Sequence, residues 1–239
     1  MPKREPQWLK KLGPLGAVIA GAIKFKTAIL LILTKSAQLK MLLSMLASFG
    51  LYWSIYGWKF AAGFVIGIYI HEMGHVWMLK QYGLRASMPM FVPGFGAFVS
   101  MYDSPANVGQ DARIGLAGPL WGAGTAIAFA LMPRLYSSGI WMALAQVTAY
   151  INLFNLTPVW TLDGGRAFRA LDFRQRLIWM GVVAVLLYET REWLFGLLLI
   201  GAAYRVFWKK DHAPEPDGGA LVEFCALMAI FAALLVFAR

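Results

Sequence analysis

Long apolar stretches with few charges dominate this sequence, and several approach the roughly 20 residues that a helix needs to cross a bilayer. They are Met41 to Trp58, Phe60 to Leu79, Ile114 to Met132, Ile140 to Leu156, Leu177 to Tyr188, Trp193 to Phe207 and Ala220 to Ala238. Because 59% of the residues are hydrophobic and only 14% are charged, a soluble globule would lack a polar surface. The stretches show no sustained strand alternation, so we expect an all-α polytopic membrane protein with about six spanning helices.

The 22 lysines and arginines are distributed unevenly between the loops. If the stretch that ends at Leu79 exits to the cytoplasm, all but four of these residues fall on the cytoplasmic side. The exceptions are Lys59, Arg134, Arg191 and Arg239. This positive-inside pattern predicts one orientation, and it explains the net charge of +10 without a nucleic-acid partner.

The chain divides into a basic segment over residues 1–40, a membrane core over 41–208, and a linker with a last apolar helix over 209–239. The lysines between positions 24 and 40 favour an amphipathic helix on the cytoplasmic face over a true span or a cleaved signal peptide. The single cysteine, Cys225, excludes an intrachain disulfide and a cysteine-based metal cluster. Residues 177–208 form a hairpin whose halves are short for full spans.

An interval between two of the predicted spans is apolar but rich in turn residues. It runs from Gln81 to Ala112, and its portion from Met88 to Met101 is too broken by proline and glycine for a spanning helix. We expect a re-entrant, extended loop there, with a packed structural loop as the alternative.

The motif His71-Glu72-Met73-Gly74-His75 lies inside one of the apolar stretches. Its imidazoles are four residues apart, so on a helix they share one face and can hold one metal ion, with a carboxylate beside them. An ionisable residue at bilayer depth is costly and is a functional candidate by default. The alternative is structural: the histidines could cap or bridge helices.

Catalytic zinc usually takes three protein ligands, so a third donor is needed from elsewhere in the chain. Asp163 is our candidate, because it follows a helix-ending Asn155 to Pro158 segment and precedes two glycines that permit a tight turn. It could instead be only a helix N-cap. Glu223 is the competing carboxylate, whereas Glu189 and Glu192 fall on the far side of the membrane in this topology, and His212 is predicted to be a linker residue.

Three separated stretches of the chain resemble the site-2 protease family of membrane metallopeptidases, peptidase family M50. They are His71 to His75, then Ala117-Gly118-Pro119, then Asn155-Leu156-Thr157-Pro158 with Leu162-Asp163-Gly164-Gly165. The resemblance implies one zinc ion held by His71, His75 and Asp163, with Glu72 as the general base and Asn155 as a stabiliser of the oxyanion. It also implies that Met88 to Met101 forms a re-entrant, β-like loop that holds the substrate as a strand.

The sequence departs from the family pattern at a few positions. Gly122 stands where many members have an asparagine, and Trp160 and Thr161 replace a common proline pair. The chain has no room for the PDZ or CBS domain of many relatives, so we expect a minimal membrane core.

The predicted function is hydrolysis of a peptide bond within or near the transmembrane segment of a membrane-anchored substrate, in regulated intramembrane proteolysis. We expect the bacterial plasma membrane, with the site nearer the cytoplasmic face, and the sequence does not indicate an oligomeric state. One rival is a prenyl-protein endopeptidase, against which the Leu162-to-Gly165 element argues. The other is a zinc transporter or binding protein that uses the same ligands without cleavage.

Overall fold

The computed structural model describes Lys26 and residues 36–135, 138–159, 162–209, 213 and 217–238. Nearly all of the predicted amphipathic N-terminal segment therefore lies outside the described residues. So do Trp160, Thr161 and His212.

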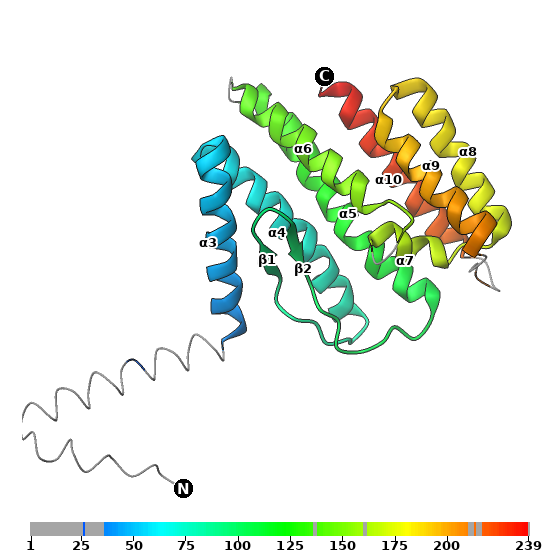
Figure 1. Cartoon of the computed structure of the whole chain (residues 1–239), viewed down its shortest axis with the longest axis horizontal. Coiled ribbons are helices and arrows are strands. Elements are labelled where there is room, and N and C mark those ends of the chain that lie inside the picture. Colours follow the sequence, from blue (N-terminus) through cyan, green and yellow to red (C-terminus); the bar gives the residue numbers. More distant parts are fainter. Residues whose placement is uncertain are drawn as a thin grey trace, which may run out of the picture.

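The described chain is mostly helical, and each apolar stretch of the sequence lies largely within one helix (Figure 1). The long helices are α3 (Ala37–Tyr56), α4 (Trp58–Gln81), α5 (Val108–Leu131), α6 (Gly139–Asn155), α8 (Phe173–Thr190), α9 (Trp193–Tyr204) and α10 (Gly218–Phe237). The short elements are α7 (Asp163–Arg169), the 3₁₀ turn η1 (Met132–Arg134) and the π-helix η2 (Arg205–Lys209).

Polar residues in the loops fix where these helices begin. Asn107 accepts a hydrogen bond from the Gln110 backbone amide at the start of α5. Asp172 and Gln175 form a reciprocal capping box at the start of α8. Such caps satisfy backbone donors that a helix leaves unpaired at its N-terminus, so short polar segments delimit long apolar helices.

The interval after α4 forms a small antiparallel hairpin, which confirms the predicted β-like element. Strand β1 (Met90–Val92) pairs with β2 (Gly96–Phe98), with Phe91 opposite Ala97. Phe91 is buried against Tyr52 of α3 and Ile68 of α4, and its backbone amide donates to Ser44 Oγ at 3.2 Å. The hairpin is thus attached to α3 through β1, and β2 lies on the side of α4 (Figure 1).

Helix α5 is central and packs against α4, α6, α7 and α10. The main core lies among α5 to α10, and within it the Trp179 ring contacts the rings of Phe168 and Phe224. Small residues allow the close approach of α4 to α5: a Cβ on Gly74 would press against the Ala117 carbonyl group.

Within the described ranges, three helices are long and apolar enough to cross a membrane: α3, α5 together with η1, and α10. The α3–α4, α5–α6 and α8–α9 junctions all lie at one end of the molecule, at the top of Figure 1. Lys59, Arg134 and Arg191 belong to these junctions. Among the described residues, the helix ends that carry most of the other lysines and arginines, including Lys80, Arg169 and Lys209, lie at the opposite end.

Candidate metal centre

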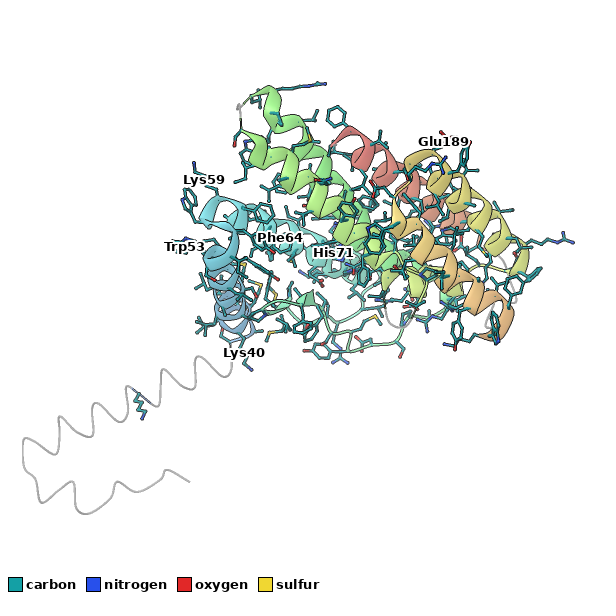
Figure 2. All side chains as sticks on the ribbon, turned by 45° about the horizontal axis from the view of Figure 1, so that its top comes forward. Lys40, Trp53, Lys59, Phe64, His71 and Glu189 are labelled. Atoms are coloured by element: carbon teal, nitrogen blue, oxygen red, sulfur yellow. The ribbon has the colours of Figure 1, made fainter. Side chains whose placement is uncertain are left out.

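Helix α4 places His71 and His75 one turn apart on a buried face. Figure 2 shows His71 among the helices, away from the molecular surface at Lys59 and Glu189. Their Nε2 atoms lie 3.2 Å apart, and both residues are less than a tenth exposed. The predicted pairing of the two imidazoles on one helix face is therefore confirmed.

Asp163 joins the two histidines from helix α7. Its Oδ2 lies 3.2 Å from His71 Nε2 and its Oδ1 lies 3.3 Å from His75 Nε2. Asp163 is the first residue of α7, and the N-cap position belongs to Leu162. The alternative in which Asp163 serves only as an N-cap is therefore wrong, because its carboxylate faces the imidazoles.

Both imidazoles are held by their other nitrogen. His75 Nδ1 lies 2.7 Å from the Ile114 carbonyl oxygen, and His71 Nδ1 lies 2.7 Å from Asn152 Oδ1. Because these oxygens only accept, each Nδ1 must donate its proton, which leaves each neutral imidazole with a lone pair on Nε2. Two nitrogen lone pairs and a carboxylate thus converge, an arrangement that could hold a metal ion.

The spacing of these atoms fits a tetrahedral zinc ion. Bonds of about 2.0 to 2.1 Å place the ligands of a tetrahedral site about 3.3 to 3.4 Å apart. The two Nε2 atoms are 3.2 Å apart, and each lies 3.2 or 3.3 Å from a different oxygen of the Asp163 carboxylate. The three residues form a group that could hold a metal ion. Two imidazoles and one carboxylate also match the donor set of catalytic zinc sites.

Glycines make room for this convergence. A Cβ on Gly118 would overlap both imidazoles, which explains the glycine in the Ala117-Gly118-Pro119 element. A Cβ on Gly164 would overlap the Leu156 carbonyl group. Gly164 and Gly165 lie within α7 and neither has a positive φ, so the expectation of a glycine-dependent tight turn is wrong. Gly164 instead lets α7 approach the end of α6.

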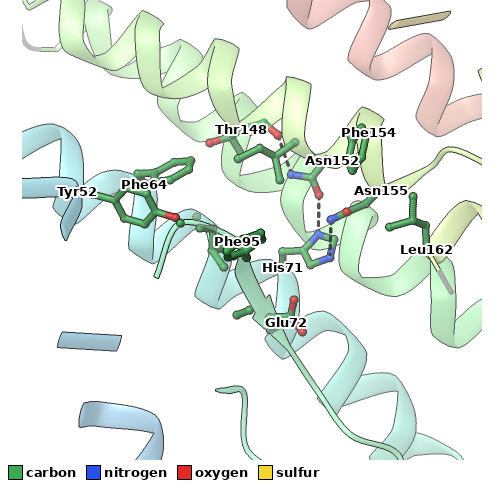
Figure 3. A pocket seen from close by; sticks show the side chains of 16 residues that line it. Tyr52, Phe64, His71, Glu72, Phe95, Thr148, Asn152, Phe154, Asn155 and Leu162 are labelled. Atoms are coloured by element: carbon green, nitrogen blue, oxygen red, sulfur yellow. Dashed lines mark hydrogen bonds between the residues drawn. The ribbon is translucent and has the colours of Figure 1, made fainter. Parts of the chain in front are cut away.

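Two cavities meet at the candidate centre. One, of about 250 Å³, is lined by His71, His75 and Asp163 together with Glu72 and Asn155. The other, of about 420 Å³, extends from His71, Glu72 and Asn155 toward Phe64 and the hairpin tip (Figure 3). Asn155 Nδ2 lies 3.4 Å from His71 Nε2. Glu72 and Asn155 therefore line both cavities beside His71.

The competing carboxylates lie elsewhere. Glu223 Oε2 is 3.3 Å from Arg113 Nη1. Glu192 Oε2 accepts a hydrogen bond of 2.7 Å from the Tyr150 hydroxyl. Among the residues that the structure describes, neither joins the group formed by His71, His75 and Asp163.

Sequence reasoning missed Asn152, which orients His71. Its Nδ2 donates to the Thr148 carbonyl oxygen at 2.8 Å, which turns Oδ1 toward the imidazole. A Cβ on Gly122 would overlap the Asn152 amide. The departure at Gly122 is thus explained, because the missing side chain makes room for an amide from α6.

An ionic cluster also ties α7 to α5. Asp111 accepts from Arg166 Nη2 at 2.7 Å and from Arg169 Nη2 at 2.6 Å. Since α7 carries Asp163, this cluster fixes the helix that supplies the carboxylate.

The fold and the site together define a helical membrane protein with an HExxH-type metal centre. Residues 59–139 match the sequence pattern of peptidase family M50, in agreement with the resemblance that the motifs carry. The matched region contains His71 to His75 and Ala117 to Pro119, but not Asn155 or Asp163.

A zinc metalloprotease of Methanocaldococcus jannaschii is 32% identical over 111 residues, which cover 44% of this chain and 32% of that protein. The chain therefore spans about a third of the length of the curated relative that it matches. A solved site-2 protease from the same organism aligns over 74% of this chain and 90% of its own, with a TM-score of 0.43 and 20% identity.

Proposed function

We propose that this protein is an intramembrane zinc metalloprotease that hydrolyses a peptide bond within or near the transmembrane segment of a membrane-anchored substrate. The observation that carries the proposal is the convergence of His71 Nε2, His75 Nε2 and the Asp163 carboxylate at separations of 3.2 to 3.3 Å. The family match and the metalloprotease relative support the same chemistry.

His71, His75 and Asp163 would hold the zinc. A zinc ion with three protein ligands keeps a fourth position open, lowers the pKa of a water there to about 7 and polarises a carbonyl group. The cavity that these residues line with Glu72 provides space on that side for the water and the scissile peptide.

Glu72 would act as the general base. It lies next to His71 on α4, is only 6% exposed, and lines both cavities at the centre. Its carboxylate would take a proton from the attacking water and deliver it to the leaving amine when the C–N bond breaks.

Asn155 would stabilise the developing oxyanion. Its amide Nδ2 is a hydrogen-bond donor at the wall shared by the two cavities. A fixed donor aimed at developing charge lowers the barrier most in a site with little water.

Strand β2 would bind the substrate in an extended form. Ala97 and Phe98 line the smaller cavity with Glu72, while β1 lies on the other side of β2, toward α3. A helical substrate hides its carbonyls in its own hydrogen bonds, so its segment must unwind, and pairing with β2 would compensate for the lost bonds. Helix-breaking residues should therefore favour cleavage.

The membrane core would comprise residues 41–208, and together with the last helix, α10, the chain would have about six spans. The candidate spans and the concentration of basic residues at one end of the helices support this arrangement. By the positive-inside rule that end faces the cytoplasm, and water would reach Glu72 from there.

A cleavage assay with a matched variant tests the proposal. The substrates are dye-labelled single-span peptides that carry a helix-breaking Asn-Gly pair at different depths, reconstituted with the full-length chain. Glu72→Gln should lower cleavage by about 10²- to 10⁴-fold and keep its zinc. Glu189→Gln, which removes an exposed carboxylate of α8, should leave both unchanged. If zinc-loaded Glu72→Gln cleaves as fast as the wild type, Glu72 is not the general base. If the zinc-loaded wild type cleaves none of these substrates, the protease assignment is wrong and a binding or transport role gains support.

A further inference from the structure

A third cavity, of about 610 Å³, lies between α6, α7 and the end of α9. We propose that this α6–α9 cavity binds an anionic phospholipid, with the phosphate at its basic end and an acyl chain along its apolar wall. The basic end consists of Arg169, Arg205 and Lys209, and the apolar wall includes Phe154, Leu197 and Ile200. The proposal depends on the membrane location of the chain but not on peptide hydrolysis.

The cations come from two separate elements. Arg205 and Lys209 are the first and last residues of the π-helix η2, a form of helix that often occurs at functional sites. Arg205 is 4% exposed, and its Nη1 donates to the Gly165 carbonyl oxygen at 2.7 Å, so its guanidinium is fixed in place. Arg169 comes from α7. The described residues that line the cavity include no Asp or Glu. Asp111 contacts Arg169 from outside the lining but is shared with Arg166, so cations exceed carboxylates among these described residues.

The cavity changes from basic to apolar along α9. Leu197, Ile200, Tyr204 and Lys209 follow one another along α9 and η2, so the charged groups lie at the helix end and the aliphatic groups lie deeper. Ile200 is 70% exposed and Tyr204 is 56% exposed, as expected for side chains that face lipid and the membrane interface. A phospholipid has the same division into phosphate and hydrocarbon, whereas a free phosphate would leave the apolar wall uncovered.

The position of the basic end also favours a lipid. In the orientation proposed above, this end of the bundle faces the cytoplasm, where anionic lipids give the leaflet a negative surface potential. Basic pockets between spanning helices on that side are sites for anionic headgroups.

The α6–α9 cavity adjoins the metal centre. Leu162 and Phe154 line both this cavity and the larger cavity beside His71. The Gly165 carbonyl group that Arg205 holds is two residues from Asp163. A bound phospholipid would therefore restrict the motion of the start of α7, where Asp163 would supply the third metal ligand.

Lipid titration of the delipidated, full-length chain in neutral detergent tests the proposal, with binding followed by native mass spectrometry. Phosphatidylglycerol should bind at least about tenfold more tightly than phosphatidylcholine with the same acyl chains, since charge-assisted bonds to phosphate are strong. The double variant Arg169→Gln/Lys209→Gln should lose most of this preference. In this variant Asp111 keeps Arg166 as a partner. If the double variant does not fold, Lys209→Gln alone, which changes an exposed side chain, should still reduce the preference for phosphatidylglycerol.

The matched control is Lys80→Gln/Arg174→Gln, which removes two exposed cations of the same end that do not line the cavity. It should change the phosphatidylglycerol affinity less than about twofold, because screened charges outside the site contribute little. Equal losses in the cavity and control variants, or equal affinity of the wild type for both lipids, would overturn the proposal.

A third variant distinguishes a lipid from a free anion. Ile200→Trp fills the apolar wall without a change in charge and should weaken phosphatidylglycerol binding. Inorganic phosphate should not displace the lipid. If Ile200→Trp binds the lipid normally and millimolar phosphate displaces it, the cavity is a free-anion site and the lipid assignment is wrong.

Discussion

Asn152 Oδ1 lies 2.7 Å from His71 Nδ1, and this contact determines which nitrogen of the imidazole can bind a metal. The Asn152 amide has one orientation, because its Nδ2 donates to the Thr148 carbonyl oxygen. His71 Nδ1 must therefore carry the proton, and its Nε2 lone pair faces His75 and Asp163.

Replacing Asn152 should weaken the metal centre without removing a ligand. Asn152→Leu keeps the approximate volume but loses the acceptor, and we expect the zinc affinity to fall about 10- to 100-fold. Asn152→Asp keeps an acceptor toward Nδ1 and should retain most of the affinity. Competition with a zinc chelator measures both. Equal affinities of the wild type and Asn152→Leu would show that the contact does not orient His71.

Gly122 should be required for the same orientation. Gly122→Ala adds a Cβ that overlaps the Asn152 amide, so we expect a destabilisation of about 1 to 3 kcal/mol and weaker zinc binding. Gly124→Ala is the control on the same helix, because its Cβ has open space around it. Thermal unfolding and chelator competition measure the stability and the zinc affinity of both variants. If Gly122→Ala and Gly124→Ala lose stability and zinc affinity equally, Gly122 is not required to orient Asn152.

The ionic cluster at Asp111 should hold α7 in place. Asp111→Asn removes the charge that Arg166 and Arg169 share, and we expect the free energy of unfolding to fall by about 1 to 3 kcal/mol. Zinc should also dissociate faster, since α7 carries Asp163. Asp103→Asn breaks the exposed pair with Arg85 and should have a much smaller effect. If Asp111→Asn leaves the zinc dissociation rate unchanged, the ionic cluster does not contribute to holding Asp163 at the metal centre.

The loop between the hairpin and α5 contains a titratable contact outside the spans. Hydrogen bonds from the Arg85 guanidinium and backbone amide lower the pKa of Asp103 from 3.8 to about 2. Because the folded pKa is depressed, the stabilisation by this pair is fully present above pH 3.8 and is lost as the pH falls through about 2. NMR titration of the labelled Asp103 carboxyl group checks this value, and Arg85→Gln should return the midpoint toward 3.8. A wild-type midpoint near 3.8 would contradict the contact.

Much of the fold follows from local sequence patterns. The apolar stretches predict the long helices because every backbone group in lipid must be bonded within its own segment. The prolines and glycines between Met88 and Met101 predict an interruption, and the hairpin lies there. Because residues four apart lie on the same face of a helix, the spacing of His71 and His75 predicts that their imidazoles are neighbours.

What the sequence could not predict depends on contacts between distant segments. Asn152 looks like any polar residue in a buried helix until α6 is placed beside α4. The role of Gly164 depends on the Leu156 carbonyl of another helix, so its sequence neighbours suggested a turn instead. Asp163 could be chosen over Glu223 through the family resemblance, because spacing along the chain does not determine which carboxylate meets the imidazoles.

The zinc content of three purified proteins tests the central claim most directly. The wild type should contain one zinc ion per chain, Asp163→Ala should lose it, and Glu223→Ala should keep it, because the Asp163 carboxylate lies 3.2 Å from His71 Nε2 while Glu223 pairs with Arg113. A full zinc complement in Asp163→Ala, together with its loss in Glu223→Ala, would contradict the proposed metal centre and the hydrolytic function that depends on it.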